Sequence, residues 1–485
     1  MAEQIVKGIV AKIPEGYYKP SGKKIIRTTE ELNVRDYATA QVYEPNLIPE
    51  NIAKDVKVLG VVGTHEGGAG GIIPSGTIDI TENGTYDVTS YEKVNVAVAG
   101  SGESTLKKMI QQMGTAEKLF IYNEYITDLT DILNYNDTQG IENAYEMFYG
   151  CIKLQTIPEF ATSSIKNMKH MFYGCKKLVE APFVDMQNAT DTSEMFAECR
   201  EIEKVNLSYE CKSTTAERMF SYCYKLKEAP LFDTSNITTM SYMFDRCYLF
   251  TTIPLYNTSN ITNFSGMMLY CNKLVEFPAI NTSKAETMKS MFNGCTALES
   301  LPTLDMSKVT DMSSFLNGCS NFSQDLILDV PNCKTYQSVC YKCPKIEKVV
   351  LKNTSLVTNF NAAFNSCSKL YCVDIDTYNI SSSSNTLSVG NCYSLKALVI
   401  RNFGTNYVIG TSTFSNCYHI LGTTNTAYNP NGLKDGYIYV PRNMIETLST
   451  ATNWSTHASQ LRALEDYTLD GTTTGELDLA KMGLE

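Results

Sequence analysis

The sequence has few of the side chains on which most catalytic and metal sites depend. Its 485 residues contain four histidines, His65, His170, His419 and His457, which are scattered and not paired at metal-binding spacing. It also lacks a Gly-rich phosphate loop followed by Lys-Ser/Thr and a Gly-x-Ser-x-Gly motif. We therefore expect a protein that is not an enzyme and that binds neither a cofactor nor a metal ion.

Long apolar runs and a surplus of basic residues are missing too. No run of 18 apolar residues could span a membrane, and residues 1–20 lack the apolar core of a secretory signal. We see no carboxy-terminal anchor. The 41 Lys+Arg stand against 52 Asp+Glu, a net charge of −11, whereas a protein that reads a nucleic-acid backbone needs a concentrated basic surface. We expect no membrane insertion and no nucleic-acid partner.

Cysteine is absent from the first hundred residues and then returns at a fixed interval. Ten cysteines follow one another at steps of 24 residues, and two more follow at steps of 25. A period of 20–30 residues is typical of a solenoid. The twelve periodic cysteines are Cys151, Cys175, Cys199, Cys223, Cys247, Cys271, Cys295, Cys319, Cys343, Cys367, Cys392 and Cys417.

Each repeat combines two spacings. Before the cysteine, apolar residues recur three or four apart, as in Met240, Met243 and Phe244, which predicts one face of a short helix. After the cysteine, the pattern either alternates, as in Ile346-x-x-Val349-x-Leu351, and predicts a short strand, or contains proline and predicts an extended, irregular rung. Stacked repeats bury their apolar edges on one another. The sequence therefore predicts an α/β solenoid of about twelve coils.

The cysteines suit a buried corner between helix and rung, because Cys is small, apolar and commonly buried. A zinc site at Cys340-Tyr-Lys-Cys343 is not expected, since Cys340 stands where other repeats have Phe172 or Phe292. Parallel neighbouring thiols fit the disulfide dihedral poorly, so we predict a structural ladder of reduced thiols. Cys372 lies in a slot that other repeats fill with charged residues, and we expect it to face water.

The repeats resemble BspA-type leucine-rich repeats, in particular the subtype MFxxCxxLxxxPxxDTSxVTxM. MFNGCTALESLPTLDMSKVTDM (291–312) matches it nearly throughout, and the resemblance covers about 140–435. It implies a leucine-rich-repeat array over 141–435, closed by a cap over 436–467 with a strand at Tyr437–Val440, and followed by a polar, mobile tail over 468–485. The cysteine precedes the strand here, and Thr or Met fills the usual Asn slot, so no asparagine ladder is expected.

The amino-terminal region is different in kind. Residues 34–71 and 76–98 resemble segments of structural proteins of tailed bacteriophages that infect Gram-positive hosts. The residues predict a buried strand at Val56–Val62, a hairpin of Ile78–Ile80 and Tyr86–Val88 around Asn83-Gly84, and a third strand at Val94–Val98. We divide this small, mainly-β region as follows: 1–71 for virion docking, 72–103 for the hairpin module and linker, and 104–140 for a helical cap of the repeats.

The exposed slots of the repeats vary, whereas the core slots do not. Positions one, two, four and five after each cysteine change from coil to coil and carry many Tyr and Lys side chains, and varied exposed slots are how solenoids present binding faces. The alternative is that these are solvated residues without a partner. The candidate binding residues are Lys176, Lys177, Tyr224, Lys225, Tyr248, Lys273, Tyr393 and Tyr418.

Two functions follow from these resemblances. The first is a phage virion appendage, either a tail or baseplate fibre or a head decoration. Its amino-terminal region would dock on other virion proteins, its repeats would bind a host cell-surface protein or glycan, and it would form a homo-oligomer on the particle. The second is a bacterial cell-surface adhesin with the same repeats. The missing export signal favours the virion, which is assembled in the host cytoplasm.

Overall fold

The computed structural model describes residues 115–130, 133 and 135–484, together with Ile110 and nine short strands in the first hundred residues. The chain divides into two compact units, unit 1 at 1–236 and unit 2 at 237–485. The amino-terminal strands are β1 (Ile9–Lys12), β2 (Lys23–Ile26), β3 (Glu31–Leu32), β4 (Thr39–Val42), β5 (Lys57–Val58), β6 (Val61–Val62), β7 (Thr77–Ile80), β8 (Thr85–Tyr86) and β9 (Lys93–Val96).

The pairing of these strands differs from the sequence prediction. The strands β7 and β8 flank Asn83-Gly84, but β7 pairs in parallel with β9 and β8 pairs antiparallel with β4, so the predicted hairpin is wrong. The strand predicted at Val56–Val62 is instead the two short antiparallel strands β5 and β6. Alternating apolar residues mark strands but do not select their partners. The rest of 1–109, including most of the phage-like segments, lies outside the described residues.

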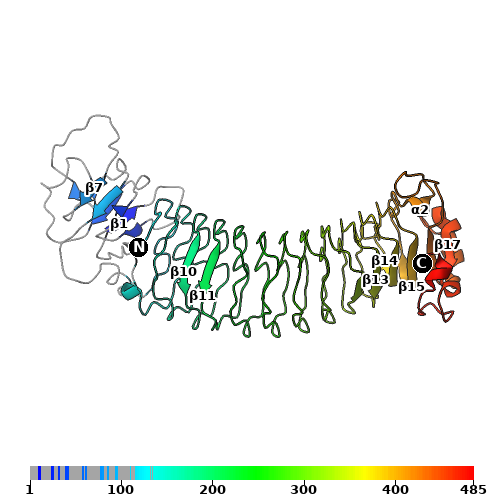
Figure 1. The fold of residues 1–485 in the computed structure, drawn as a ribbon, viewed down its shortest axis with the longest axis horizontal. Coiled ribbons are helices and arrows are strands. Elements are labelled where there is room, and N and C mark those ends of the chain that lie inside the picture. Colours follow the sequence, from blue (N-terminus) through cyan, green and yellow to red (C-terminus); the bar gives the residue numbers. More distant parts are fainter. Residues whose placement is uncertain are drawn as a thin grey trace, which may run out of the picture. The chain divides into compact units, whose positions relative to one another are not determined.

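The repeats form a parallel β-solenoid of about twelve coils with few helices, so the predicted architecture is confirmed. Figure 1 shows successive coils in each unit, with strands on only some of them. Unit 1 carries β10 (Glu180–Val184) and β11 (Lys204–Leu207), paired in parallel. Unit 2 carries one parallel sheet of β12 (Leu326–Asp329), β13 (Lys348–Lys352), β14 (Cys372–Ile380), β15 (Ala397–Tyr407), β16 (Tyr437–Val440) and β17 (Leu461–Ala463).

The segment before each cysteine is a run of turns, and the predicted short helix is wrong. In the coils of Cys151 to Cys367, the residues five and one before the cysteine have φ between +49° and +77°, a left-handed conformation that interrupts a helix. Alternate N–H groups then point to the next coil: Phe172 N donates to Met195 O at 2.9 Å and Gly174 N to Ala197 O at 2.8 Å. These bonds between coils offset the cost of the left-handed residues. Apolar spacing of three to four fits such turns as well as a helix.

The proline rungs lack regular strands, as the sequence predicts, with one exception. In unit 2, Pro254, Pro278 and Pro302 lie in rungs without strand pairing, because proline cannot donate to a ladder. In unit 1, Pro182 lies within β10, where the register to β11 shifts between Glu180 and Phe183. Proline is therefore accommodated at an irregularity of an edge strand.

Aromatic rings stack through the core of unit 1. The phenylalanine three residues before each cysteine lies against its counterpart in the next coil, with ring centroids 5.0 to 5.7 Å apart and nearly parallel planes. The stack comprises Phe120, Phe148, Phe172, Phe196 and Phe220, the last four of which are fully buried. Residues 115–130, expected to be a helical cap, form turns that hydrogen-bond to the coil of Cys151, as Phe120 N does to Met147 O at 2.8 Å.

Unit 2 ends in short strands, short helices and a tail, and the tail does not behave as predicted. β16 has the predicted bounds, and it is followed by α3 (Ile445–Thr450) and β17. Trp454 is buried and its Nε1 donates to Tyr407 O at 2.6 Å. The tail, expected to be mobile, bridges Thr468 to Leu477 and ends in α4 (Leu479–Met482). Its apolar residues pack on the sheet, and this packing holds the tail in place.

Candidate functional site

The thiol groups of the cysteine ladder are hydrogen-bond donors. Each Sγ lies 2.9 to 3.2 Å from a backbone carbonyl of the preceding coil, mostly that of the residue three before the preceding cysteine, as in Cys175 to Phe148 O and Cys295 to Met268 O. A cysteine is thus small enough for the corner and supplies a weak donor there. The bond recurs at Cys151, Cys175, Cys199, Cys223, Cys271, Cys295, Cys319, Cys343, Cys367, Cys392 and Cys417.

Burial makes these thiols poor nucleophiles. All sixteen cysteines are buried and free, and burial raises the pKa of Cys417 to about 12 and of Cys333 to about 11. Thiolates, which react and bind metals, are therefore rare at neutral pH. In the part of the chain that the structure describes, no group of three or more His, Cys, Asp or Glu residues could hold a metal ion.

Cys372 does not face water, so that prediction is wrong. It begins β14 and is fully buried in a cluster with Ala397, Tyr439 and, from the tail, Met482. Burial raises the pKa of its thiol to about 12. The slot is exposed in other coils, as at Glu180 and Glu228, and only the returning tail covers it here. Repeat periodicity alone could not reveal this contact.

A second ladder was missed by the sequence analysis. Eight residues before the cysteine, nearly every coil has Asn, Asp or Thr, whose side-chain oxygen accepts the N–H two residues on, as Asn167 does from Lys169 and Asp311 does from Ser313. These residues also pair in parallel between coils, as Asn263 does with Thr287. The signal was present in the sequence as a fixed Asn/Asp/Thr slot. Such local bonds set the backbone entering each turn.

The lysines predicted to form a binding face differ in their surroundings. Lys177, Lys225 and Lys273 are exposed, whereas Lys176 is half-buried. Lys225 pairs with Glu201 of the preceding coil, and that hydrogen bond lowers the pKa of the Glu201 carboxyl. Such pairs link neighbouring coils at the surface, where each contributes about 0–1 kcal/mol.

The predicted tyrosines are all half-buried and lie against neighbouring side chains. The Arg200 guanidinium lies 5.8 Å from the Tyr224 ring centroid, and the rings of Tyr393 and Tyr418 stack with centroids 5.3 Å apart. Tyr248 is half-buried on the next coil after Tyr224. The eight residues lie one or two positions after the cysteine in six coils, and their role in binding stays a prediction.

Large apolar side chains are exposed eight residues after the cysteine, a slot that the sequence analysis did not select. In unit 1, Phe183 and Leu231 are 45% and 55% exposed, and Tyr209 nearby is 58% exposed. In unit 2, Leu255 and Ile327 are 68% and 61% exposed. We call these residues the apolar rows of the two units. Exposed apolar residues gathered on one face point to an interaction surface.

The slot of Ile327 continues along the sheet to strands that the tail covers. Strand register aligns Ile327 with Val350, then Asp374, Val399 and Tyr439. Exposure falls along this line from 61% at Ile327 to half-buried at Val350 and almost none at the other three. The tail, through Leu477 and Met482, covers the buried end.

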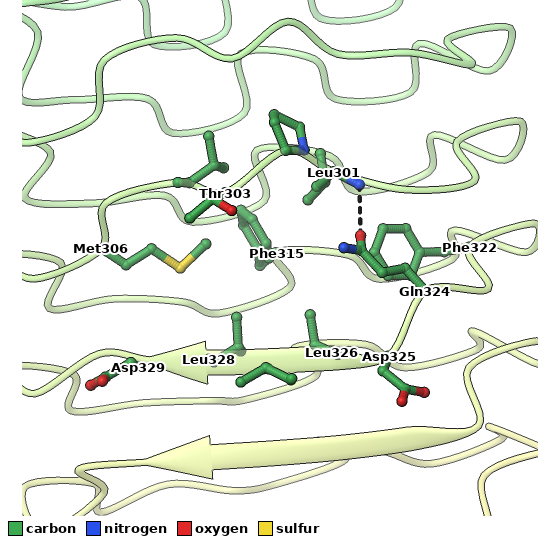
Figure 2. Close-up of a pocket in the computed structure, with 13 residues that line it drawn as sticks. Leu301, Thr303, Met306, Phe315, Phe322, Gln324, Asp325, Leu326, Leu328 and Asp329 are labelled. Carbon is green, nitrogen blue, oxygen red and sulfur yellow. Dashed lines mark hydrogen bonds between the residues drawn. The ribbon is translucent and has the colours of Figure 1, made fainter.

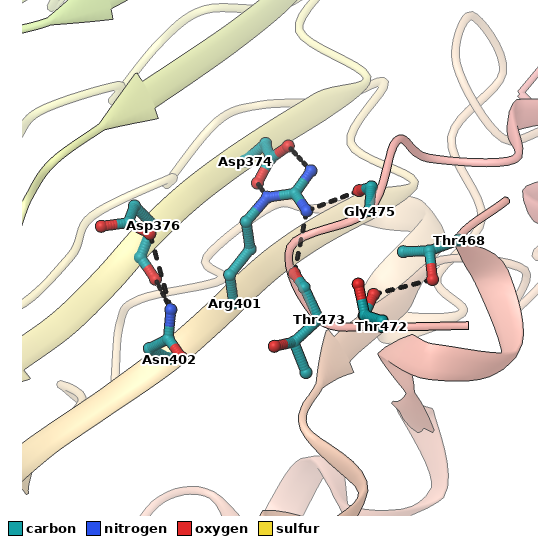
Figure 3. Close-up of polar contacts among 8 residues, drawn as sticks. All are labelled: Asp374, Asp376, Arg401, Asn402, Thr468, Thr472, Thr473 and Gly475. Atoms are coloured by element: carbon teal, nitrogen blue, oxygen red, sulfur yellow. Dashed lines mark hydrogen bonds and ion pairs between the residues drawn. The ribbon is translucent and has the colours of Figure 1, made fainter. Parts of the chain in front are cut away.

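An arginine fixes the tail on the sheet. Arg401 of β15 makes a two-point ion pair with Asp374 of β14, at 2.8 and 2.7 Å, and its Nη1 donates to Thr473 O and Gly475 O at 2.9 and 2.8 Å. Figure 3 shows the guanidinium between the strand and the tail. The side chain of Asp374 is 4% exposed, so this is a largely desolvated pair with all its partners in place. A peptide segment of the chain itself thus docks on this face by apolar packing and arginine–carbonyl bonds.

In the described residues, no helix is both long and apolar enough to cross a membrane. The comparison with curated proteins gave no match. Among solved structures, the fold is similar to a leucine-rich repeat protein from Bacteroides ovatus, with 18% identity, 80% of this chain and 92% of that chain covered, and a TM-score of 0.43. It is also similar to a leucine rich cell surface protein from Faecalibacterium prausnitzii, with 14% identity, 72% and 79% covered, and a TM-score of 0.34.

Family models match the repeat array itself. Residues 115–231 and 214–330 match the family described as Mycoplasma protein of unknown function, DUF285. Residues 315–421 match the BspA type leucine rich repeat region, in six copies. Together, these matches extend over the coils that carry the cysteine ladder. The repeats over 115–330 are thus of the DUF285 kind, and those over 315–421 are of the BspA-type leucine-rich-repeat kind.

Proposed function

We propose that this chain is a non-enzymatic binding protein whose coils present an apolar, rigid rung face to a protein or glycan on another surface. The observation that carries the proposal is the pair of apolar rows, in which Leu231, Leu255 and Ile327 are each more than half exposed. Solenoids hold such residues on a fixed backbone, so little conformational entropy is lost on binding. The buried, high-pKa thiols and the lack of a metal-binding cluster in the described residues fit a scaffold.

We infer that the protein acts at a bacterial cell surface, as an adhesin. The family matches concern the repeats, which are the part on which the adhesin hypothesis rests. The virion appendage remains a second candidate. It is supported by the resemblance of residues 34–71 and 76–98 to phage structural proteins, which would dock the chain on other virion proteins as a homo-oligomer.

The binding role is tested by removing the apolar rows. Tyr209→Ser with Leu231→Ser, and Leu255→Ser separately, should leave the circular dichroism unchanged, because exposed substitutions usually shift stability by less than about 0.5 kcal/mol. Binding to arrays of glycans and extracellular proteins should weaken at least tenfold, as expected if anchors are lost. Lys227→Ser, an exposed change outside the rows, is the matched control. Equal binding by all variants would contradict the proposal.

Location is tested separately. Antibodies against the repeats, imaged by immunogold electron microscopy, should label the envelope of cells that produce the chain. Label on released phage particles and not on cells would favour the virion appendage.

A further inference from the structure

The sheet of unit 2 has an open edge at β12. This strand is the first in the order β12-β13-β14-β15-β16-β17, so it has a strand partner on one side only. On its other side lies the proline rung of the preceding coil, residues 301–305. Among the residues that the structure describes, no backbone hydrogen bond joins this rung to β12. An unpaired edge presents backbone donors and acceptors to an incoming strand.

A groove of about 370 Å³ separates that rung from β12. Its apolar lining includes the buried rings of Phe315 and Phe322 and the inward side chains of Leu326 and Leu328. Figure 2 shows Leu301 and Thr303 across the groove from these two leucines. The groove therefore combines an apolar lining with a free strand edge.

Proline keeps the groove from closing. Pro302 has no N–H, so the rung cannot complete a ladder with β12. The coils are joined at one end by Ser323 N, which donates to Glu299 O at 3.0 Å, and by Leu301 N, which donates to Gln324 Oε1 at 2.9 Å. The Gln324 side chain thus accepts the hydrogen bond that a strand backbone would otherwise accept at this end of the groove. Beyond Gln324, the edge of β12 is open.

The charge of the groove selects among extended peptides. Asp325 and Asp329 lie at the two ends of β12, as Figure 2 shows, and none of the thirteen lining residues is basic. Asp329 accepts one hydrogen bond, from Asn353 at 2.7 Å. Two carboxylates flanking an apolar floor complement a segment with apolar residues in its centre and Lys or Arg at its ends.

We propose that β12 binds an extended peptide segment of a partner protein as an added strand. About four residues of that segment would span β12, since a strand rises about 3.3 Å per residue. Its alternate side chains in line with Leu326 and Leu328 contact Phe315 and Phe322, and its basic ends lie near Asp325 and Asp329. This rests on the proposed binding function and names the class of partner.

The test is selection from a synthetic heptapeptide library on the full chain. Selected peptides should have alternating apolar residues with Lys or Arg at the ends, and should bind saturably. Methylation of the backbone nitrogens on one edge of a selected peptide should weaken binding at least tenfold, whereas methylation on the other edge should not. Equal effects on both edges would overturn strand addition.

A matched pair of variants locates the site. Thr303→Trp fills the groove and should weaken peptide binding at least tenfold. Ala279→Trp places the same side chain in the equivalent exposed slot one coil earlier, outside the groove, and should leave binding unchanged. Asp325→Asn with Asp329→Asn should weaken binding severalfold and reduce its salt dependence.

The outcomes separate this inference from the proposed function. If Thr303→Trp weakens the binding of no selected peptide, the proposal of strand addition at β12 is wrong. This holds even if the apolar-row variants no longer bind the arrays. If peptides bind at β12 while the apolar-row variants bind the arrays normally, peptide binding in the groove is supported. The proposal that the apolar rows bind the partner is then contradicted.

Discussion

Within unit 2, the coils of Cys247, Cys271 and Cys295 have proline in the rung, whereas the coils from Cys319 onward add strands β12–β17 to one sheet. The turn side is the same in both regions. Phe292 N donates to Phe315 O at 3.0 Å in a proline coil, and Cys340 N donates to Ala363 O at 3.1 Å in a strand coil. The hydrogen bonds between turns and the thiol hydrogen bonds thus join the coils in both regions. The two regions differ in the pairing of their rungs.

The difference shows what proline contributes. The strand coils pair along the rung from β12 to β17, and the tail covers the outer face of the sheet from β14 onward. In the proline coils, the backbone hydrogen bonds described between rungs lie near the start of each rung, as from Val275 N to Thr251 O at 2.9 Å, and Thr258 Oγ1 donates to Asn281 O at 2.7 Å at the far end. In unit 2, the exposed Leu255 lies on an unpaired proline rung, and Ile327 and the β12 groove lie at the border with the sheet.

The largest expected effect tests whether the turn side is shared. Phe292 and Phe364 occupy the same slot in a proline coil and a strand coil, and both are fully buried. Phe292→Ala and Phe364→Ala should each cost about 3–5 kcal/mol, the usual range for this truncation. Urea unfolding followed by circular dichroism measures both. A loss at Phe364 much larger than at Phe292 would mean that the sheet, and not the turn side, supports the strand coils.

The rung side should respond to proline in opposite ways. Val350→Pro removes an N–H from β13, which has a strand partner on each side, and should cost about 3 kcal/mol or more. Pro278→Val, in a rung without a ladder, should change stability by less than about 1 kcal/mol. If Pro278→Val lowers the unfolding free energy as much as Val350→Pro does, the proline rungs are not free of strand pairing, contrary to the stated difference between the two regions.

The thiol ladder should contribute equally in both regions. Cys295→Ala and Cys343→Ala each remove a sulfur and its hydrogen bond, at 3.0 and 2.9 Å, and should cost about 1–2 kcal/mol. Cys→Ser at the same positions keeps a donor and should cost less than Ala. If serine costs more than alanine at both positions, packing alone explains the cysteines.

The smallest expected effect is acid sensitivity at the covered end. Burial alone would raise the pKa of the Asp435 carboxyl, but hydrogen bonds from His419 and Lys396 outweigh it and lower the pKa below 3.8. The ionised carboxylate therefore stabilises the fold above the unfolded pKa, and this is lost as pH falls through the lower folded value. Asp435→Asn should be less stable than the parent at pH 7 and should approach it in acid. If the difference in unfolding free energy between Asp435→Asn and the parent is the same at pH 7 and in acid, the lowered pKa of Asp435 is contradicted.

Sequence periodicity predicted the solenoid and the twelve coils, because each core slot must repeat for coils to stack. The strand β16 was predicted from the resemblance of 436–467 to a closing segment. Periodicity could not distinguish a helix from left-handed turns, since both place apolar residues three to four apart. It also could not show the tail returning over Cys372, because that contact is made once, between segments about a hundred residues apart.

The candidate binding surface was only partly accessible from sequence. Varied slots identified exposed lysines such as Lys225, but the slot after the rung proline, which holds the exposed Leu231 in unit 1 and Leu255 in unit 2, was not selected. Whether an apolar rung residue points inward depends on the rung backbone, which proline alters. The groove at β12 arises where two rung types meet, and no single repeat contains that information.

Native-state hydrogen exchange, resolved to single amides, tests the central claim most directly. Slow exchange is expected on the turn side of both regions, for example at Ser290, Phe292, Ser338 and Cys340, because each N–H bonds to the next coil. On the rung side, β13 and β14 should exchange slowly, and residues 303–305 should exchange fast, because Leu301 N is bonded to Gln324 and Pro302 has no amide hydrogen. Protection of 303–305 equal to that of β13, or fast exchange at the turn amides of the proline coils, would contradict the account.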